Sequence, residues 1–182
     1  MSGLTIPVDA EDHAAGSSDA PVTLVEYGDY ECPHCAAAHP VVKTLLSEMP
    51  SDLRFVFRNF PLTQIHEHAM LAAQAAEAAG SQGEEHFWRM HDEMLEHQDQ
   101  LDVINLLATA SDLGLDVSRF RTDLEASRFR PRVEKDFHGG VRSGVNGTPT
   151  FFINGVRHDG GFDEGSLRQA IRAAVGIHSG SR

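Results

Sequence analysis

Hydrophobic and polar positions alternate with different periods along the chain, and its first third predicts two strands joined by a helix. The apolar run at 22–27 in APVTLVEYGDY is typical of a strand buried on both faces. LRFVFRNF, residues 53–60, alternates apolar and charged side chains and predicts a second strand. Residues 33–49 between them predict a helix that has Pro33 in its first turn and ends before Pro50.

This order of strand, helix and strand predicts a βαβ unit. Such a unit pairs its two strands in parallel and connects them by a right-handed crossover. The residues that precede it, 1–19, are rich in Gly, Ser, Asp and Ala. We expect an irregular lead-in there, with a short edge strand at LTIPV, residues 4–8.

The middle of the chain, residues 62–143, has the apolar spacing of helices and no evident strand. HAMLAAQAAEAA is a strong helix former that Gly80 stops. Further helices are predicted in EEHFWRMHDEMLEHQ, VINLLATASDLG, DVSRFRTDLEASRF and RPRVEKDFHGGVRSG.

The last segment returns to β character. TPTFFINGVRHDG predicts a hairpin, because the dipeptide Asn154-Gly155 separates two short apolar runs. Asp163 is then placed to cap a final helix at about 164–175.

Together these elements predict one α/β sheet whose two halves are separated in sequence by a helical insertion. The predicted division is a lead-in at 1–19, the α/β domain at 20–61 and 144–178, the insertion at 62–143, and a tail at 179–182.

Composition and charge exclude several classes of function. The formal net charge is −12, with 15 Lys and Arg against 27 Asp and Glu, so nucleic acid and anionic membranes are not expected as partners. No apolar run approaches the roughly 18–20 residues that span a bilayer. The N-terminus has no positive region followed by an apolar stretch, which leads us to expect a cytoplasmic protein.

The two cysteines of the chain, Cys32 and Cys35, stand at the start of the first predicted helix. A structural disulfide is disfavoured, because the cytoplasm is reducing and so short a loop gains little from closure. A zinc half-site would need two more ligands, for which His39, His66 and His68 are candidates. The third interpretation is a redox pair.

Redox chemistry needs a thiolate, and the N-terminus of a helix stabilises one. Cys32 lies at that end and is predicted to attack the substrate, while Cys35, one turn on, resolves the mixed disulfide. His34 between them is expected to add a hydrogen bond or positive charge, and Pro33 to tune the pair. A Cys32 pKa of ~5 would stabilise its thiolate by about 2.7 kcal/mol at pH 7. That stabilisation would make the reduction potential of the cysteine pair roughly 60 mV more oxidising.

The motif CPHC after VTLVEYGDYE, together with GVNGTPTFFING, resembles the DsbA-like branch of the thioredoxin superfamily. The resemblance covers about 20–178 and implies a thioredoxin-like α/β fold interrupted by an all-helical insertion. It also implies exchange with protein or peptide thiols and disulfides, and recycling by glutathione or a thioredoxin-type partner. No cofactor is needed, because the sulfurs carry the two electrons.

Three further site residues carry over from this resemblance. Pro149 in GTPT matches a cis-proline that faces the disulfide, and Thr148 would offer its backbone to an extended substrate. Glu26 matches a buried acid that would shuttle the proton of Cys35, its pKa raised by desolvation. The competing interpretation of Glu26 is an acid that points to solvent from a sheet edge.

Two other functions remain open from the sequence. One is a redox-inactive thioredoxin-like module that binds extended peptides or a metal, and the other is a glutathione-linked transferase or isomerase. The direction of net exchange, whether oxidation, reduction or isomerisation, is also open. Five histidines are expected at the surface or at helix caps and are left out of the site: His66, His68, His86, His91 and His97.

Overall fold

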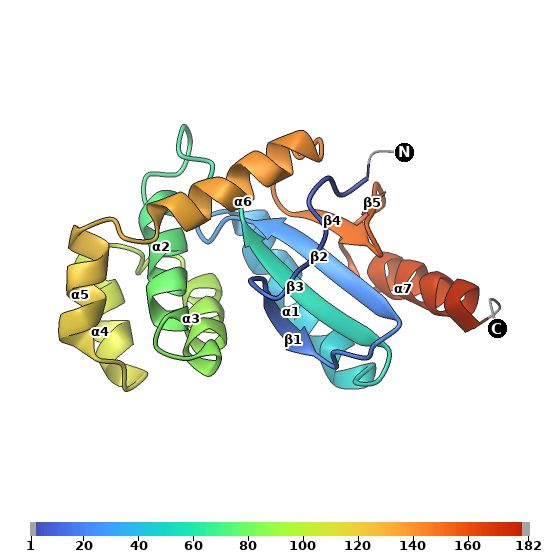
Figure 1. The fold of residues 1–182 in the computed structure, drawn as a ribbon, viewed down its shortest axis with the longest axis horizontal. Helices are drawn as coiled ribbons and strands as arrows, with labels where there is room; N and C mark the ends of the chain where they lie inside the picture. The colour runs from blue at the N-terminus through green and yellow to red at the C-terminus, as the bar shows by residue number, and fades with distance from the viewer. Residues whose placement is uncertain (1–2, 180–182) are drawn as a thin grey trace.

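A five-stranded mixed sheet forms the centre of the computed structural model, which describes the backbone of residues 3–179 and the side chains of residues 3–177 (Figure 1). The strands are β1 (His13–Gly16), β2 (Val22–Gly28), β3 (Leu53–Asn59), β4 (Thr150–Ile153) and β5 (Val156–His158). The helices are α1 (Pro33–Glu48), α2 (Ala69–Gly80), α3 (Glu84–Glu96), α4 (Val103–Asp112), α5 (Val117–Glu125), α6 (Arg130–Arg142) and α7 (Glu164–Ser179). Among the described residues, no helix has both the length and the hydropathy that crossing a bilayer requires.

The order of the strands is β1-β3-β2-β4-β5. β2 and β3 are parallel, which confirms the predicted βαβ unit, and the other neighbours are antiparallel. Asn154 and Gly155 have φ values of 49° and 80°, the left-handed pair that a tight hairpin between β4 and β5 requires. The predicted cap is also present, since the Asp163 carboxylate accepts a hydrogen bond from the Ser166 amide.

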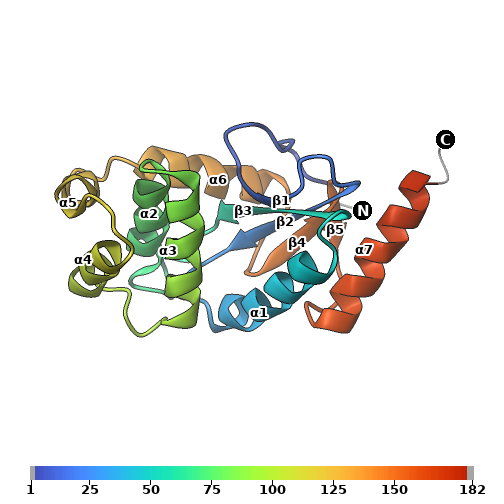
Figure 2. The same cartoon turned by 90° about the horizontal axis from the view of Figure 1, so that it is seen from below.

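The period of two along β2 sends alternate side chains into two separate cores. Leu24 joins the larger core on the face covered by α1 and α7, whereas Val25 and Tyr27 join the smaller core beneath α6. Figure 2 shows the sheet nearly edge-on between these helices. Gly140 lets α6 approach closely, because a Cβ there would lie 2.7 Å from the Phe60 ring.

Helices α2 to α5 gather beyond one end of the sheet, as Figure 2 shows. α6 differs from them, because it runs back along the sheet and packs against β3. The part of the chain predicted as the insertion therefore also supplies one covering helix of the sheet, and the limits of the two domains stay a prediction.

The edge strand of the lead-in is not where the sequence placed it. Residues 4–8 form no strand, and His13–Gly16 pair with β3 as β1. The short segment HAAG has little intrinsic β preference, so its conformation comes from pairing with the open edge of β3. Residues 1 and 2 of the lead-in lie outside the described residues, as does the predicted tail except for Ser179, which ends α7.

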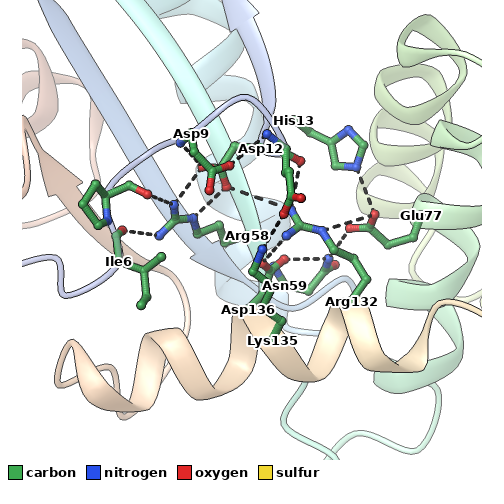
Figure 3. A network of polar contacts seen from close by, with 12 residues as sticks. Ile6, Asp9, Asp12, His13, Arg58, Asn59, Glu77, Arg132, Lys135 and Asp136 are labelled. Atoms are coloured by element: carbon green, nitrogen blue, oxygen red, sulfur yellow. Dashed lines mark hydrogen bonds and ion pairs between the residues drawn. The ribbon is translucent and has the colours of Figure 1, made fainter.

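A buried arginine on β3 holds the lead-in against the sheet (Figure 3). Arg58 is 3% exposed and donates two hydrogen bonds of 2.8 Å to the Asp12 carboxylate. It also donates to the carbonyls of Ile6 and Pro7 and to the hydroxyl of Tyr27. All of these bonds cross from β3 to the lead-in or to β2, so a single side chain joins three segments.

The network continues from Arg58 to the helices (Figure 3). Asn59 donates through its side chain to Glu77 of α2 at 2.7 Å and through its backbone to Asp136 of α6 at 3.1 Å. His13 lies 3.0 Å from the second oxygen of Glu77. These contacts hold the end of β3 and the strand β1 against α2 and α6.

Candidate active site

The two cysteines lie where the sheet meets the first turn of α1. Cys32 is the N-cap residue, with the extended backbone (φ −76°, ψ 121°) that a residue before proline favours, and Pro33 opens the helix. The carbonyl of Cys32 accepts hydrogen bonds from the amides of Cys35 and Ala36. Cys32 is 4% exposed and Cys35 is fully buried, and both are free thiols.

The environment separates the acidities of the two sulfurs. The pKa of Cys32 falls to about 5, chiefly because the Cys35 thiol donates a hydrogen bond to it. The Thr148 side chain and the backbone amides of Cys35 and His34 add to this lowering of the pKa, against desolvation. Burial raises the pKa of Cys35 well above its usual value. At neutral pH the pair holds one thiolate, on Cys32, and one thiol, on Cys35.

His34 contributes through its backbone. Its ring is exposed, and its described contact is an edge contact with Phe162 at 6.2 Å between centroids. The part of the stabilisation that His34 supplies to the Cys32 thiolate comes from its backbone amide at the helix N-terminus. The sequence led us to expect that the His34 imidazole would give Cys32 a hydrogen bond or a positive charge. The described contact of the ring is with Phe162 and not with Cys32.

The loop before β4 places a backbone carbonyl beside the leading sulfur. The Thr148-Pro149 peptide bond is cis, as expected from the resemblance. Cys32 Sγ lies 3.5 Å from the Thr148 carbonyl oxygen. The structure therefore brings these two residues, which are more than a hundred positions from Cys32, to the same site.

Glu26 lies inside the sheet and not at a solvated edge. It is 3% exposed, and its Oε1 has no hydrogen-bond partner among the described residues. Desolvation, followed by the negative charge of Cys32, raises its pKa to about 8. At neutral pH the carboxyl is mostly protonated, and it titrates within reach of physiological pH.

Two acid–histidine pairs, which the sequence analysis left out, hold the Cys32 loop. Asp29 is buried, and its Oδ2 lies 2.8 Å from His66 Nδ1. Glu31 lies 3.2 Å from His68 Nδ1 and accepts a 2.6 Å hydrogen bond from the His68 amide. These bonds dock the loop after β3 onto the residues just before Cys32.

Gln98 is a second feature that the sequence analysis missed. It follows α3, and its side-chain amide donates to the carbonyls of Tyr30 at 2.9 Å and Cys32 at 2.8 Å. No motif marks this residue, because a lone Gln after a helix carries no pattern. The contact shows that the helical insertion supports the active-site turn directly.

A zinc site at the cysteine pair would need histidine ligands beside the two sulfurs. Within the described part of the chain, no cluster of metal-ligating residues includes Cys32 or Cys35. His66 and His68 face Asp29 and Glu31 instead. The expectation that His91 is at the surface is wrong, since it is 2% exposed, packed against aromatic rings between α3 and the sheet.

The chain matches a family model and a part of several curated proteins. A family model described as thioredoxin matches residues 9–173. Among curated proteins, the chain is 48% identical over 172 residues to the Na(+)/H(+) antiporter NhaA 1 of Salinispora arenicola, covering 94% of this chain and 26% of that protein. A protein of the same name from Mycobacterium sp. (strain KMS) is 42% identical, with 94% and 28% covered. The chain thus spans about a quarter of the length of these relatives.

Solved structures resemble almost the whole chain. Oxidised BdbD from Bacillus subtilis superposes with a TM-score of 0.81 at 25% identity, covering 91% of this chain and 93% of that one. A thioredoxin-like oxidoreductase from Silicibacter pomeroyi DSS-3 gives 0.81 at 28% identity, covering 92% and 94%. α-DsbA1 from Wolbachia pipientis shares the fold, with a TM-score of 0.80 over 96% of both chains at 21% identity.

Three observations indicate the same fold family: the matched family model, the helical insertion, and the Cys-Pro-His-Cys turn beside a cis-proline. The chain belongs to the thioredoxin family, and its fold, helical insertion included, is the one seen in the DsbA-like structure.

Proposed function

We propose that the protein exchanges a Cys32–Cys35 disulfide with the thiols of protein substrates through a mixed disulfide at Cys32. The observation that carries this proposal is the asymmetry of the two sulfurs. Cys32 has a pKa of about 5, while the pKa of the buried Cys35 is raised. Only Cys32 is then both ionised at neutral pH and adjacent to the Thr148 carbonyl.

Oxidation of a substrate dithiol proceeds in two displacements. A substrate thiolate attacks the Cys32 sulfur of the disulfide, and the Cys35 thiolate leaves and takes up a proton. The second substrate thiolate then attacks the substrate sulfur of the mixed disulfide and releases the Cys32 thiolate. The substrate loses two electrons and the Cys32–Cys35 pair gains them. Reduction of a substrate disulfide is the same sequence in reverse.

Glu26 is proposed to handle the proton of Cys35. The carboxyl is buried on the strand beneath the pair, and its pKa of about 8 allows both gain and loss of a proton near neutral pH. Thr148 is proposed to pair with extended substrate through its backbone, as an edge strand does. Glutathione or a thioredoxin-type protein would reset the pair between turnovers.

The functional test uses both directions of exchange. Protein oxidised with glutathione disulfide is mixed with a reduced, unfolded protein that has one cysteine pair, and loss of free thiols is followed. In parallel, reduced protein is mixed with insulin. Because a stable thiolate favours the reduced state by about 2.7 kcal/mol at pH 7, we expect oxidation of thiols to be the faster direction. No exchange in either assay would reject the proposal in favour of a binding module.

Glu26→Gln is expected to slow resolution of the mixed disulfide and to remove a pH dependence of stability. The raised pKa means that stability due to Glu26 is present below pH 4.5 and is lost as pH rises through about 8. Urea unfolding of the reduced wild type and the reduced variant across this range should show the stability difference due to Glu26 disappear as pH rises. If the free energy of unfolding changed with pH in the same way in wild type and variant, and both resolved the mixed disulfide at the same rate, Glu26 would have no role in the mechanism.

The reduced protein is expected to gain stability over the oxidised protein as pH rises from 5 to 9. The pKa of Cys32 is lowered from 9.0 to about 5, so the stabilisation is present above pH 9 and is lost as pH falls through 5. The expected slope is about 1.4 kcal/mol per pH unit in that window. Comparing unfolding of the two redox forms cancels most other titrations. If the difference in unfolding free energy between the two redox forms did not change with pH, the Cys32 pKa would not be lowered.

A further inference from the structure

A second cluster of polar side chains lies between α1 and α3, away from the sulfurs. His39 comes from α1, while His91 and Asp92 come from α3, and their ligand atoms lie within 4.8 Å of one another. His39 is 6% and His91 2% exposed. All three line a cavity of about 160 Å³, so there is room beside them for an ion and a water molecule.

One buried nitrogen atom of this cluster has no hydrogen-bond partner among the described residues. His39 Nε2 is buried and makes no hydrogen bond to any described residue, although it lies 3.3 Å from Asp92 Oδ1 and 3.6 Å from Glu96 Oε1. A buried imidazole nitrogen without a partner is unfavourable unless something else binds there.

The remaining atoms of two of these side chains are already held. His91 Nδ1 lies 3.0 Å from the Tyr30 hydroxyl, and Asp92 Oδ2 accepts a 2.7 Å hydrogen bond from Lys43 Nζ. Metal-binding histidines and carboxylates commonly have their second atom fixed in this way. The other carboxylate oxygen of Asp92, Oδ1, lies 3.3 Å from His39 Nε2.

The charge of the cluster, and the distance between two of its ligand atoms, suit a divalent cation. Histidine binds a metal ion as a neutral imidazole, so Asp92, Glu96 and Lys43 give the occupied cluster a net charge of −1 before the ion is counted. Ligand atoms about 2.1 Å from a tetrahedral ion are roughly 3.4 Å apart, close to the 3.3 Å between His39 Nε2 and Asp92 Oδ1. We infer that His39, His91 and Asp92 bind a divalent transition-metal ion of the Zn²⁺ class, with Glu96 or water as fourth ligand.

The inferred site goes beyond thiol exchange. His39 follows Cys35 by one helical turn on α1, so a bound ion would tie the helix that carries the cysteines to the helical insertion. Since the ion would bind the folded state, it would stabilise the protein in proportion to its affinity.

The test uses protein in which Cys32→Ser and Cys35→Ser remove the sulfur ligands. This protein is stripped with a chelator and titrated with ZnCl₂ by calorimetry, and its melting temperature is measured with and without zinc. We expect one equivalent to bind and the melting temperature to rise. Adding His39→Ala should weaken binding at least about tenfold and abolish the rise in melting temperature.

Three further variants make the result specific. His97→Ala, at an exposed histidine beyond the end of α3, should leave zinc affinity unchanged. Lys43→Met should increase it, because the competing cation on Asp92 is gone. Should His39→Ala fail to fold, Asp92→Asn at a half-buried position replaces it. The inferred site would be wrong if His39→Ala and Asp92→Asn bound zinc as tightly as the parent protein, or if the protein without cysteines bound no zinc. Neither result would bear on thiol exchange.

Discussion

Replacing Cys32 with Ser is expected to reduce thiol–disulfide exchange to the uncatalysed rate. The serine hydroxyl cannot form the mixed disulfide, and the deeply buried Cys35, with its raised pKa, cannot substitute as nucleophile. Insulin reduction and oxidation of a reduced peptide both measure the loss. Unchanged melting of the variant, followed by circular dichroism, excludes unfolding as the cause.

The matched variant Cys35→Ser gives a different result for the same physical reason. Its Cys32 still attacks, but the mixed disulfide has no resolving thiol, so it accumulates. Mass spectrometry of the variant after incubation with glutathione disulfide should show one bound glutathione at Cys32. If Cys35→Ser turned over as the wild type does while Cys32→Ser trapped the adduct, the assigned roles would be reversed.

Arg58→Met is expected to lower the free energy of unfolding by about 3–5 kcal/mol. The substitution keeps the volume of the side chain but leaves the buried carboxylate of Asp12 without its two hydrogen bonds. It also leaves the carbonyls of Ile6 and Pro7 without a donor. Urea unfolding of the purified variant measures the change directly.

Two controls identify the buried network as the cause of that loss. Arg130→Met removes an exposed pair with Glu134 on one helix and should cost less than about 0.5 kcal/mol. Adding Asp12→Asn to Arg58→Met should recover part of the loss, because the buried side chain that has lost both bonds from Arg58 is then uncharged. An Arg58→Met variant as stable as Arg130→Met would show that the lead-in is not held by this residue.

Hydrophobic periodicity and turn signals were sufficient to predict four of the five strands, β2 to β5, and the helices. The runs that form β2 and β3 and the Asn154-Gly155 turn are local signals, because burial and turn geometry depend on neighbouring residues. β1 was predicted in the wrong place, since its pairing with β3 is a tertiary effect. For the same reason, no pattern indicated that α6 would pack on the sheet.

The candidate site was predictable where a motif marks it and not elsewhere. Cys32 and Cys35 are identified by their spacing and by the proline between them. Gln98 supports the Cys32 turn through contacts that depend on how the insertion folds back, which its neighbours in sequence do not indicate. His91 was expected at the surface because helical spacing alone does not say which face of α3 is covered.

The central claim is that Cys32 is a thiolate at neutral pH because the helix N-terminus and Cys35 stabilise it. The most direct measurement is the ultraviolet absorbance of the thiolate in the reduced protein, titrated with pH and corrected with the Cys32→Ser variant. The expected midpoint is near pH 5. A midpoint near 9, the value of an unperturbed thiol, would contradict the claim.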